Sequence, residues 1–213
     1  MHQTSLIAGE SFSEVYGGLG KIVVDIGGRD ENGSLRNFFT SKGMKFICID
    51  MSKDPSVDIV VKPGDKLPFD DSSIDLIVST SCFEHDPCFW LTFKDMTRIL
   101  KPDGFIYINA PTTGVYHDYP GDNWRFYSDA GQALAYWSGK QLYNEEVFPV
   151  KIEETFHILG PWHDFVCVWK RTNNKEENIT VQPDILNKIG DLEKTINKKN
   201  YKTVKKSNIP FYS

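Results

Sequence analysis

The 213-residue sequence lacks several features that would assign it to a protein class directly. No apolar run approaches the roughly 18–20 residues that a membrane span needs, and residues 1–10 lack the basic-then-apolar layout of a signal peptide. Only four cysteines are present, and none has the CxxC or Cys/His spacing of a metal site. We therefore expect a cytoplasmic protein with reduced, buried thiols, no membrane span and no bound metal.

Positive charge is also scarce over most of the chain. Through position 170 there are 15 Lys and Arg against 24 Asp and Glu, whereas the balance reverses to 9 against 5 from Arg171 onward. An acidic body argues against a nucleic-acid substrate, because phosphate contacts need clustered cations. The charge pattern predicts one domain over residues 1–171 and a basic C-terminal tail over residues 172–213, where residues 184–196 have the apolar spacing of an amphipathic helix.

Apolar runs alternate with helix-like segments over the first half of the chain. Near-continuous Ile, Val and Leu content is typical of buried parallel strands. We expect strands at residues 21–26, 45–50, 57–61, 75–79 and 104–109, with two more near 142–149 and 164–170. Helices are expected at 34–41, 86–100 and 128–138. This order predicts an α/β fold with a doubly wound, mostly parallel sheet.

Three local signals sharpen these boundaries. Asp86 is a favourable N-cap and Pro87 suits the first position of the helix that follows. Ser128 is the expected cap of the later helix, and residues 101–104 read as a tight turn before a strand.

A nucleotide site is indicated where the first strand ends in two glycines. Gly27 and Gly28 follow that strand directly, and glycine lets the backbone approach a ligand at the carboxyl edge of the sheet. Asp50 closes the second strand, where an acid can accept both ribose hydroxyls of an adenosine.

The residues after the glycines distinguish between two nucleotides. A dinucleotide binder needs G-x-G-x-x-G for its pyrophosphate, but this loop carries Arg29, Asp30 and Glu31. Two carboxylates there would repel a pyrophosphate and would tolerate S-adenosylmethionine (SAM), which carries a sulfonium and an ammonium group. Asp25, just before the glycines, also suits that positive charge. The loop favours SAM over the NAD of an oxidoreductase.

Four segments resemble the motifs of class I SAM-dependent methyltransferases. They are DIGGRDENGS at 25–34, LPFDDSSIDLIV at 67–78, FEH at 83–85 and RILKPDG at 98–104. Their order and spacing match that family over roughly residues 20 to 130. The resemblance implies a seven-stranded Rossmann-like sheet with a reversed final hairpin, and SAM as the cofactor.

The resemblance also implies roles for cofactor-binding residues. Gly27 and Gly28 would contact the methionyl part of SAM, Asp50 would hold the ribose, and Ser81 would lie near the sulfonium. The sequence departs from many relatives in having Gly-Gly rather than G-x-G. The position of the adenine-binding acid holds Pro63, so the nearest acid, Asp65, is the candidate for that contact.

The loop after the fifth strand combines acids, a histidine, an arginine and aromatics. This composition suits a sugar-like or polar small molecule, and we expect Tyr119, Trp124 and Arg125 to contact it. If the acceptor is a hydroxyl, His117 and Asp122 are the candidate catalytic bases. Alternatively, Trp124 anchors the next helix and Arg125 pairs with a nearby acid.

Three functions therefore remain open from sequence. The first is a SAM-dependent methyltransferase acting on a small polar or glycan-like acceptor. The second is a non-catalytic SAM-fold module in a larger assembly, with the basic tail as its docking segment. The third, an NAD-type oxidoreductase, is disfavoured by the acidic glycine loop. Glu84 and His85 are read either as ligand contacts or as residues that only begin a helix. The acceptor and the oligomeric state are left open.

Overall fold

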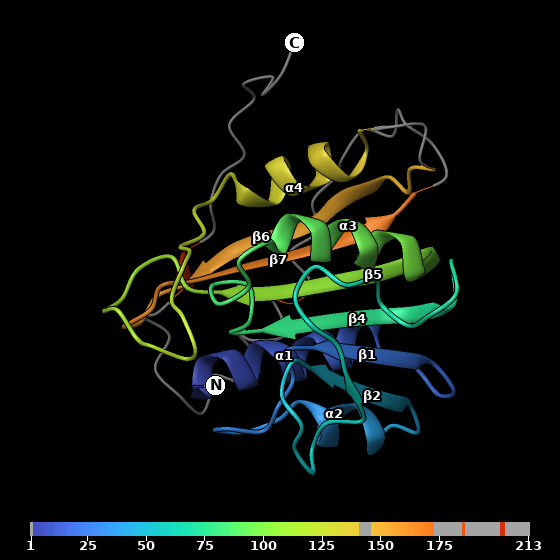
Figure 1. Cartoon of the computed structure of the whole chain (residues 1–213), viewed down its shortest axis with the longest axis horizontal. Helices are drawn as coiled ribbons and strands as arrows, with labels where there is room; N and C mark the ends of the chain where they lie inside the picture. Colours follow the sequence, from blue (N-terminus) through green and yellow to red (C-terminus); the bar gives the residue numbers. More distant parts are fainter. Residues whose placement is uncertain (1, 141–145, 173–184, 186–200, 203–213) are drawn as a thin grey trace.

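The computed structural model describes residues 2–140, 146–172, 185 and 201–202, which form a central sheet covered by helices on both faces (Figure 1). The strand order is β3-β2-β1-β4-β5-β7-β6-β8. The bounds are β1 Ile22–Ile26, β2 Lys45–Asp50, β3 Ile59–Val60, β4 Ile74–Thr80, β5 Leu100–Ala110, β6 Val150–Ile158, β7 Asp164–Arg171 and β8 Tyr201–Lys202.

The directions of the strands agree with the predicted fold class. Strands β1 to β5 pair in parallel, whereas β7 is antiparallel to both β5 and β6. The predicted seven-stranded sheet with a reversed final hairpin is therefore present. The two-residue β8 adds an eighth strand, antiparallel to β6, at the edge of the sheet.

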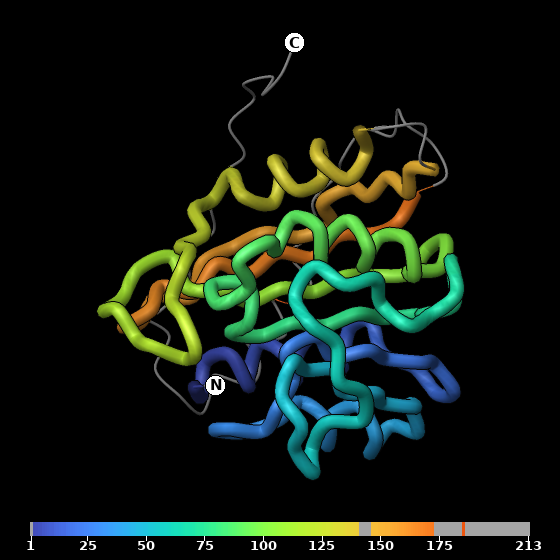
Figure 2. Tube along the Cα trace, viewed as in Figure 1, coloured from blue at the N-terminus to red at the C-terminus, as the bar shows by residue number. Residues whose placement is uncertain are grey.

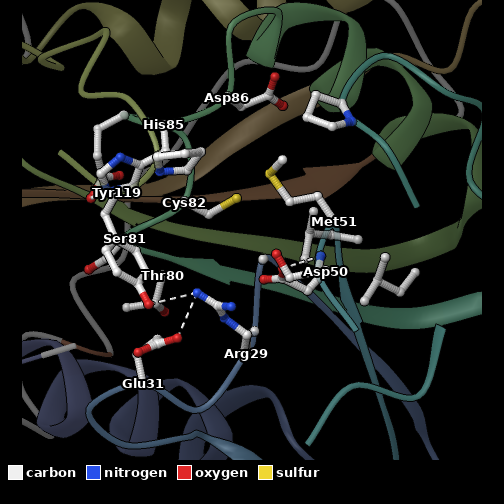
Figure 3. A pocket seen from close by; sticks show the side chains of 18 of the residues that line it. Arg29, Glu31, Asp50, Met51, Thr80, Ser81, Cys82, His85, Asp86 and Tyr119 are labelled. Carbon is white, nitrogen blue, oxygen red and sulfur yellow. Dashed lines mark hydrogen bonds and ion pairs between the residues drawn. The ribbon is translucent and has the colours of Figure 1, made fainter. Parts of the chain in front are cut away.

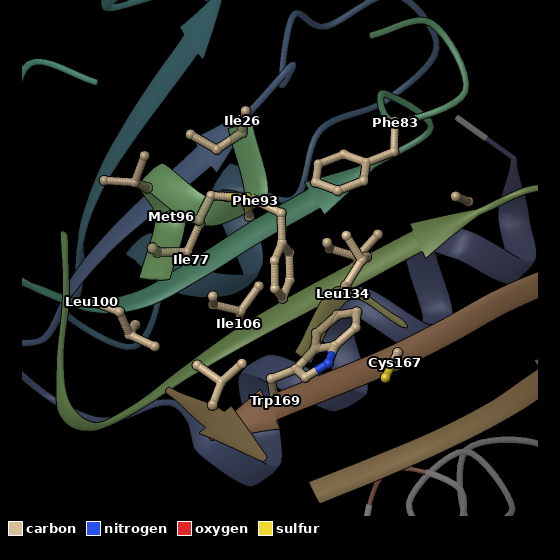
Figure 4. Packing of buried hydrophobic residues seen from close by; sticks show 14 of the residues in the cluster. Ile26, Ile77, Phe83, Phe93, Met96, Leu100, Ile106, Leu134, Cys167 and Trp169 are labelled. Carbon is tan, nitrogen blue, oxygen red and sulfur yellow. The ribbon is translucent and has the colours of Figure 1, made fainter. Parts of the chain in front are cut away.

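The helices divide between the two faces of the sheet. Helices α3 (Phe89–Ile99) and α4 (Ala130–Ser138) pack in one apolar cluster, and α1 (Gln3–Tyr16) and α2 (Arg36–Thr40) pack in the other. On the α3 side the rings of Phe93 and Trp169 meet edge to face at 4.9 Å between centroids, among Met96, Ile77 and Ile106 (Figure 4). No helix among the described residues combines the length and apolarity that crossing a membrane requires.

Two predicted helix starts are wrong by a few residues. Helix α3 begins at Phe89 with Cys88 as its N-cap, so Pro87 precedes the helix. Asp86 nevertheless organises this turn, since its carboxylate accepts hydrogen bonds from the Cys88 amide at 2.8 Å and the Thr92 hydroxyl. Helix α4 begins at Ala130 after Asp129, and not after Ser128.

Two further elements differ from the sequence expectation. Helix α1 was not predicted, and the strand expected near 142–149 is instead β6, which begins at Val150. Residues 146–149 lie outside any strand, and 141–145 lie outside the described residues. The expected turn at 101–104 is an irregularity within β5, where pairing with β4 steps from Leu100 to Phe105.

The predicted tail lies almost wholly outside the described residues. Among the residues of the expected helix at 184–196, only Ile185 is described. Its side chain is buried, and its amide donates hydrogen bonds to both carboxylate oxygens of Glu154, at 2.9 and 3.1 Å.

Candidate functional site

A cavity of about 510 Å³ opens at the carboxyl ends of β1, β2 and β4. The long connection between β5 and α4, which runs out beyond the strand ends in Figure 2, forms another wall. His2 and the first residue of β7, Asp164, also line it. The volume lies in the range of small-molecule sites. Of the candidate residues, the cavity gathers Gly27, Gly28, Asp50, Asp65, Ser81, His117 and Tyr119.

The two glycines form a backbone cradle with no room for a side chain. Gly27 has a φ of +72°, and a Cβ there would overlap the side chain of Cys82. A Cβ on Gly28 would overlap the carboxylate of Asp25. The Gly27 amide donates to the carbonyl of Ile49 at 2.8 Å, which ties the cradle to the end of β2. Backbone is therefore the surface that a ligand meets here.

Asp25 lies beneath this cradle and is not one of the cavity-lining residues. Its side chain is buried, and neither carboxylate oxygen has a hydrogen-bond partner within the described part of the chain. Burial raises the pKa of Asp25 to about 7; Arg36 opposes this shift and Asp50 adds to it. The carboxyl group can thus act on a ligand through the field it creates behind Gly28, rather than through direct contact.

Asp50 and Ser81 stand at the carboxyl ends of β2 and β4, the two strands on either side of β1. Asp50 closes β2, lines the cavity, and accepts a hydrogen bond from the Ser52 amide at 2.9 Å. Ser81 follows β4 with a φ of +51°, and its amide donates to the Asn109 carbonyl at 2.9 Å. Figure 3 shows Asp50 on one side of the cavity, and His85 and Tyr119 on the other.

The charged loop after the glycines is more neutral than the sequence suggested. Asp30 does not line the cavity, because its Oδ1 accepts the Gly33 amide at 2.9 Å. Glu31 does line it, and pairs with Arg29 at 2.6 Å. Arg29 also donates to the Tyr119 hydroxyl (Figure 3). One of the two carboxylates expected to repel a pyrophosphate therefore faces the cavity.

His117 lines the cavity, whereas the other candidate base lies behind it. Asp122 is almost fully buried, and its Oδ2 lies 3.2 Å from Nδ1 of His117. Both terminal nitrogens of Arg125 donate to the Asp122 carboxylate, and these bonds are the main reason that the pKa of Asp122 falls to about 2. Neither Asp122 nor Arg125 lines the cavity.

Trp124 also stands outside the cavity. Its indole Nε1 donates to the Asp86 carbonyl at 2.9 Å, and its ring meets Phe89 and Trp90 edge to face. This arrangement matches the anchoring alternative, in which Trp124 fixes the loop against the start of α3. The geometry gives it no contact with a molecule in the cavity.

Two further pairs line the cavity, of which the first, Glu84 and His85, was left open in the sequence between ligand contacts and residues that begin a helix. Glu84 is 2% exposed, and burial raises its pKa to about 8; its neighbour His85 also lines the cavity. His2 Nε2 lies 2.5 Å from Oδ2 of Asp164, which ties the chain just before α1 to the start of β7. The FEH segment marked the first pair in the sequence, whereas no sequence signal marked the second.

The cavity wall is strongly acidic. Seven carboxylic residues line it against two basic residues, Arg29 and Lys62, and three histidines. The seven are Glu31, Asp50, Asp65, Glu84, Asp86, Asp118 and Asp164. Since Arg29 is paired with Glu31, the electrostatic balance favours a cationic ligand over one that carries phosphates.

Comparison with known proteins gives a consistent result at the level of sequence. Residues 25–108 match a family model described as a methyltransferase domain. A curated protein named as an uncharacterized methyltransferase, from Mycobacterium sp. (strain KMS), is 31% identical over 94 residues. That match covers 40% of this chain and 36% of the relative, so the matched segment spans about a third of the length of the relative.

Solved structures show the same fold. One is a Burkholderia thailandensis 1,6-didemethyltoxoflavin-N1-methyltransferase with 1,6-didemethyltoxoflavin and S-adenosylhomocysteine bound; the TM-score is 0.59 at 14% identity, over 79% of each chain. Another is Haemonchus contortus phosphoethanolamine N-methyltransferase 1 with phosphoethanolamine and S-adenosylhomocysteine. It gives a TM-score of 0.55 at 14% identity, over 90% of this chain and 48% of that one. At these identities the likeness is one of fold.

Proposed function

We propose that this protein transfers a methyl group from SAM to a small polar or glycan-like acceptor, and the match of residues 25–108 to the methyltransferase-domain model supports this. The observation that carries the proposal is the division of one cavity into two sides. Asp50 lies on one side of the cavity, and His85 and Tyr119 lie on the other (Figure 3). The glycine cradle is tied to the end of β2 beside Asp50, and the ring of His117 packs against His85.

The cradle side fits SAM in shape and in charge. A side chain on either Gly27 or Gly28 would overlap its neighbours, so bare backbone is available for a methionyl group. Asp50 supplies a carboxylate for the ribose, and Asp65 is the proposed contact for adenine. Unpartnered Asp25 lies behind the cradle, where a positive ligand would favour its charged form.

On the acceptor side, His117 can act as a base, and Asp122 and Arg125 lie next to it. When bound, SAM provides a methyl carbon that is reactive because it is attached to a sulfonium. We assign removal of an acceptor hydroxyl proton to His117. Asp122 lies against Nδ1 of its ring and Arg125 holds Asp122, so these two are positioning residues. Tyr119 and Ser81, which also line the cavity, would orient the acceptor and the reacting methyl group.

Two finer points complete the proposal. The acidic wall supports a small polar acceptor over a nucleic acid, since phosphate contacts need clustered cations. All four cysteines are free thiols, which suits work in the reducing cytoplasm.

Calorimetry with SAM, S-adenosylhomocysteine and NAD tests the cofactor part. We expect both sulfur ligands to bind and NAD to bind far more weakly, because its pyrophosphate would face the acidic wall. Tighter binding of NAD than of either sulfur ligand would overturn the proposal. Formation of S-adenosylhomocysteine from SAM on addition of hydroxyl-bearing small molecules then separates an enzyme from a non-catalytic module.

A further inference from the structure

We propose that Glu84, His85 and His117 form a binding site for a divalent transition-metal ion on the acceptor side of the cavity. One ligand atom from each residue lies within 4.8 Å of the other two. Ligand atoms around one ion at about 2 Å each lie up to roughly 4 Å apart. The three side chains therefore need to approach by only about 1 Å to bind an ion together.

The carboxylate of Glu84 lacks a counter-charge. The side chain is 2% exposed, and Oε2 has no hydrogen-bond partner in the described part of the chain. Oε1 lies 3.7 Å from Nε2 of His85, which is beyond hydrogen-bond distance. Burying a carboxylate with one unpaired oxygen is costly, and a cation bound beside that oxygen lowers the cost. Glu84 also lines the cavity, so an ion can reach it from solvent.

The hydrogen bond that His85 makes through Nδ1 leaves Nε2 of its ring available to a ligand. Nδ1 lies 2.5 Å from the carbonyl oxygen of Gly121, and only a protonated Nδ1 can donate to that acceptor. In the neutral ring Nε2 then carries a lone pair, and Nε2 is the nitrogen that faces Glu84.

His117 is supported in the same way by a carboxylate. Its Nδ1 lies 3.2 Å from Oδ2 of Asp122 and 3.4 Å from the Val115 carbonyl oxygen, with which it makes a hydrogen-bond contact. A proton on Nδ1, which suits both acceptors, leaves Nε2 as the ring nitrogen with a lone pair. Asp122 is in turn fixed by Arg125. A metal-binding histidine commonly donates its second ring nitrogen to a carbonyl or carboxylate, which sets its tautomer and orientation. Here Nδ1 of His85 faces the Gly121 carbonyl, and Nδ1 of His117 faces the Asp122 carboxylate.

The relative placement of the two rings suits a shared ion. Their centroids are 4.8 Å apart and their planes cross at 88°. Two imidazoles and one carboxylate favour Zn²⁺, Co²⁺, Fe²⁺ or Mn²⁺ over Ca²⁺ and Mg²⁺, which prefer oxygen ligands alone. Three protein ligands leave at least one coordination position open, and all three residues line the cavity. An acceptor oxygen can take that position.

Only the description of this region as the acceptor side rests on the proposed function; binding of the ion does not. An ion on Nε2 of His117 would take the lone pair proposed above for the base. The metal-free protein and the metal-bound protein would then activate an acceptor by different groups.

Co²⁺ and Zn²⁺ are the probes for the test, added to the full chain after treatment with EDTA and dialysis. We expect calorimetry to give one ion per chain, and the visible spectrum of Co²⁺ to lack a thiolate charge-transfer band. The variants Glu84→Gln, His85→Ala and His117→Ala should each weaken binding at least tenfold. His163→Asn is the matched control, because this exposed histidine lies outside the cluster and Asn tolerates its φ of +44°.

Absence of stoichiometric binding by the folded wild-type chain would overturn the inference. Unchanged affinity in the three variants, or an equal loss in His163→Asn, would overturn it as well. Glu84→Gln is nearly isosteric and places no new charge in the buried site, so circular dichroism should show it folded. Affinity for S-adenosylhomocysteine is measured on the same samples. If the wild-type chain binds the metal ion but not S-adenosylhomocysteine, the proposed function alone is refuted. If it binds S-adenosylhomocysteine but no metal ion, the metal site alone is refuted.

Discussion

The guanidinium of Arg29 lies 2.8 Å from the hydroxyl oxygen of Tyr119, across 90 residues of sequence. The same guanidinium stands 5.3 Å from the centre of the Tyr119 ring. One residue belongs to the loop after β1 and the other to the loop after β5, so the contact joins two walls of the cavity that distant parts of the chain supply. The position of each of these two cavity-lining residues therefore depends in part on the other.

Tyr119→Phe should weaken binding of S-adenosylhomocysteine by roughly threefold to tenfold. The change removes the hydrogen bonds that the Tyr119 hydroxyl makes with Arg29 and Glu31, and solvent weakens both because Tyr119 is exposed. Calorimetry gives the affinity. Tyr127→Phe is the control, since Tyr127 is also exposed but lies outside the cavity. Equal effects of the two changes would remove any role for the Arg29 contact.

Asp50→Ala should lower SAM affinity at least tenfold. Loss of charge-assisted hydrogen bonds to the ribose costs roughly 1.5–3 kcal/mol or more. Asp50→Asn keeps an oxygen that can accept the Ser52 amide, and so separates loss of charge from loss of the local turn. We expect an intermediate affinity for the Asn variant. Wild-type affinity in a folded Ala variant would refute the ribose assignment.

Asp122→Asn and Arg125→Ala should each lower methyl transfer at least roughly tenfold, because His117 would lose its support. SAM affinity should stay within a few-fold of wild type, since neither residue lines the cavity. Turnover with the true acceptor and SAM affinity are measured on the same preparations.

The same two variants test a purely structural role for the pair. In that case the melting temperature falls and activity declines only in proportion, because the loop loosens without any specific effect on His117. Arg125→Lys keeps a cation beside Asp122 and should recover part of the activity. Full activity in both original variants would remove this loop from the acceptor site.

Asp25→Asn should flatten the pH dependence of stability between about pH 4 and pH 7. Burial raises the folded-state pKa of Asp25 to about 7, well above the ordinary value of an aspartate, so the unfolded chain loses this proton first as pH rises. Wild-type stability therefore falls through that window, by an amount on the order of a few kcal/mol, and the penalty stays constant above it.

The measurement is the difference in melting temperature between variant and wild type at pH 4.5 and at pH 7.5. We expect this difference to become more favourable to the variant at the higher pH. Asp70→Asn, at an exposed position, is the control and should show no such trend. A difference that is the same at both pH values would contradict the assignment of a protonated, buried Asp25.

The sheet could be predicted because its strands have a signal of their own. Buried parallel strands need apolar residues on both faces, and the run from Ile22 to Ile26 shows this directly. Helix α1 has no comparable signal, since its buried face includes Ser5, Ala8 and Gly9. Gly9 lies directly against Leu35, so close packing at small residues adds to the burial of Ala8 and Phe12.

Strand β6 was missed for a related reason. Its buried positions include Glu154, which reads as a solvent-facing residue in the sequence. Tyr16 and Ile185 donate hydrogen bonds to its carboxylate, and both come from distant parts of the chain. No pattern within β6 could report those partners.

The residues of the candidate site also fall into two groups: those that follow a strand directly, and those whose environment depends on distant side chains. Gly27, Gly28 and Asp50 follow strands directly, so topology alone brings them to the cavity. The environment of Glu84 depends instead on the later loop, where the amides of Asn123 and Trp124 donate to the Glu84 carbonyl. The placement of Asp122 behind His117, rather than in the cavity, likewise depends on Arg125. Side-chain pairing of this kind has no sequence spacing that predicts it.

The pairing of His2 with Asp164 has a consequence for the order in which the protein can be completed during synthesis. The two residues are separated by 162 positions, and Asp164 begins β7, which lies between β5 and β6 in the finished sheet. A growing chain has made both glycines and Asp50 long before β7 leaves the ribosome. The wall that His2 and Asp164 form together can close only when β7 has inserted beside β5. A nascent chain therefore lacks the wall that His2 and Asp164 form until β7 has been synthesised.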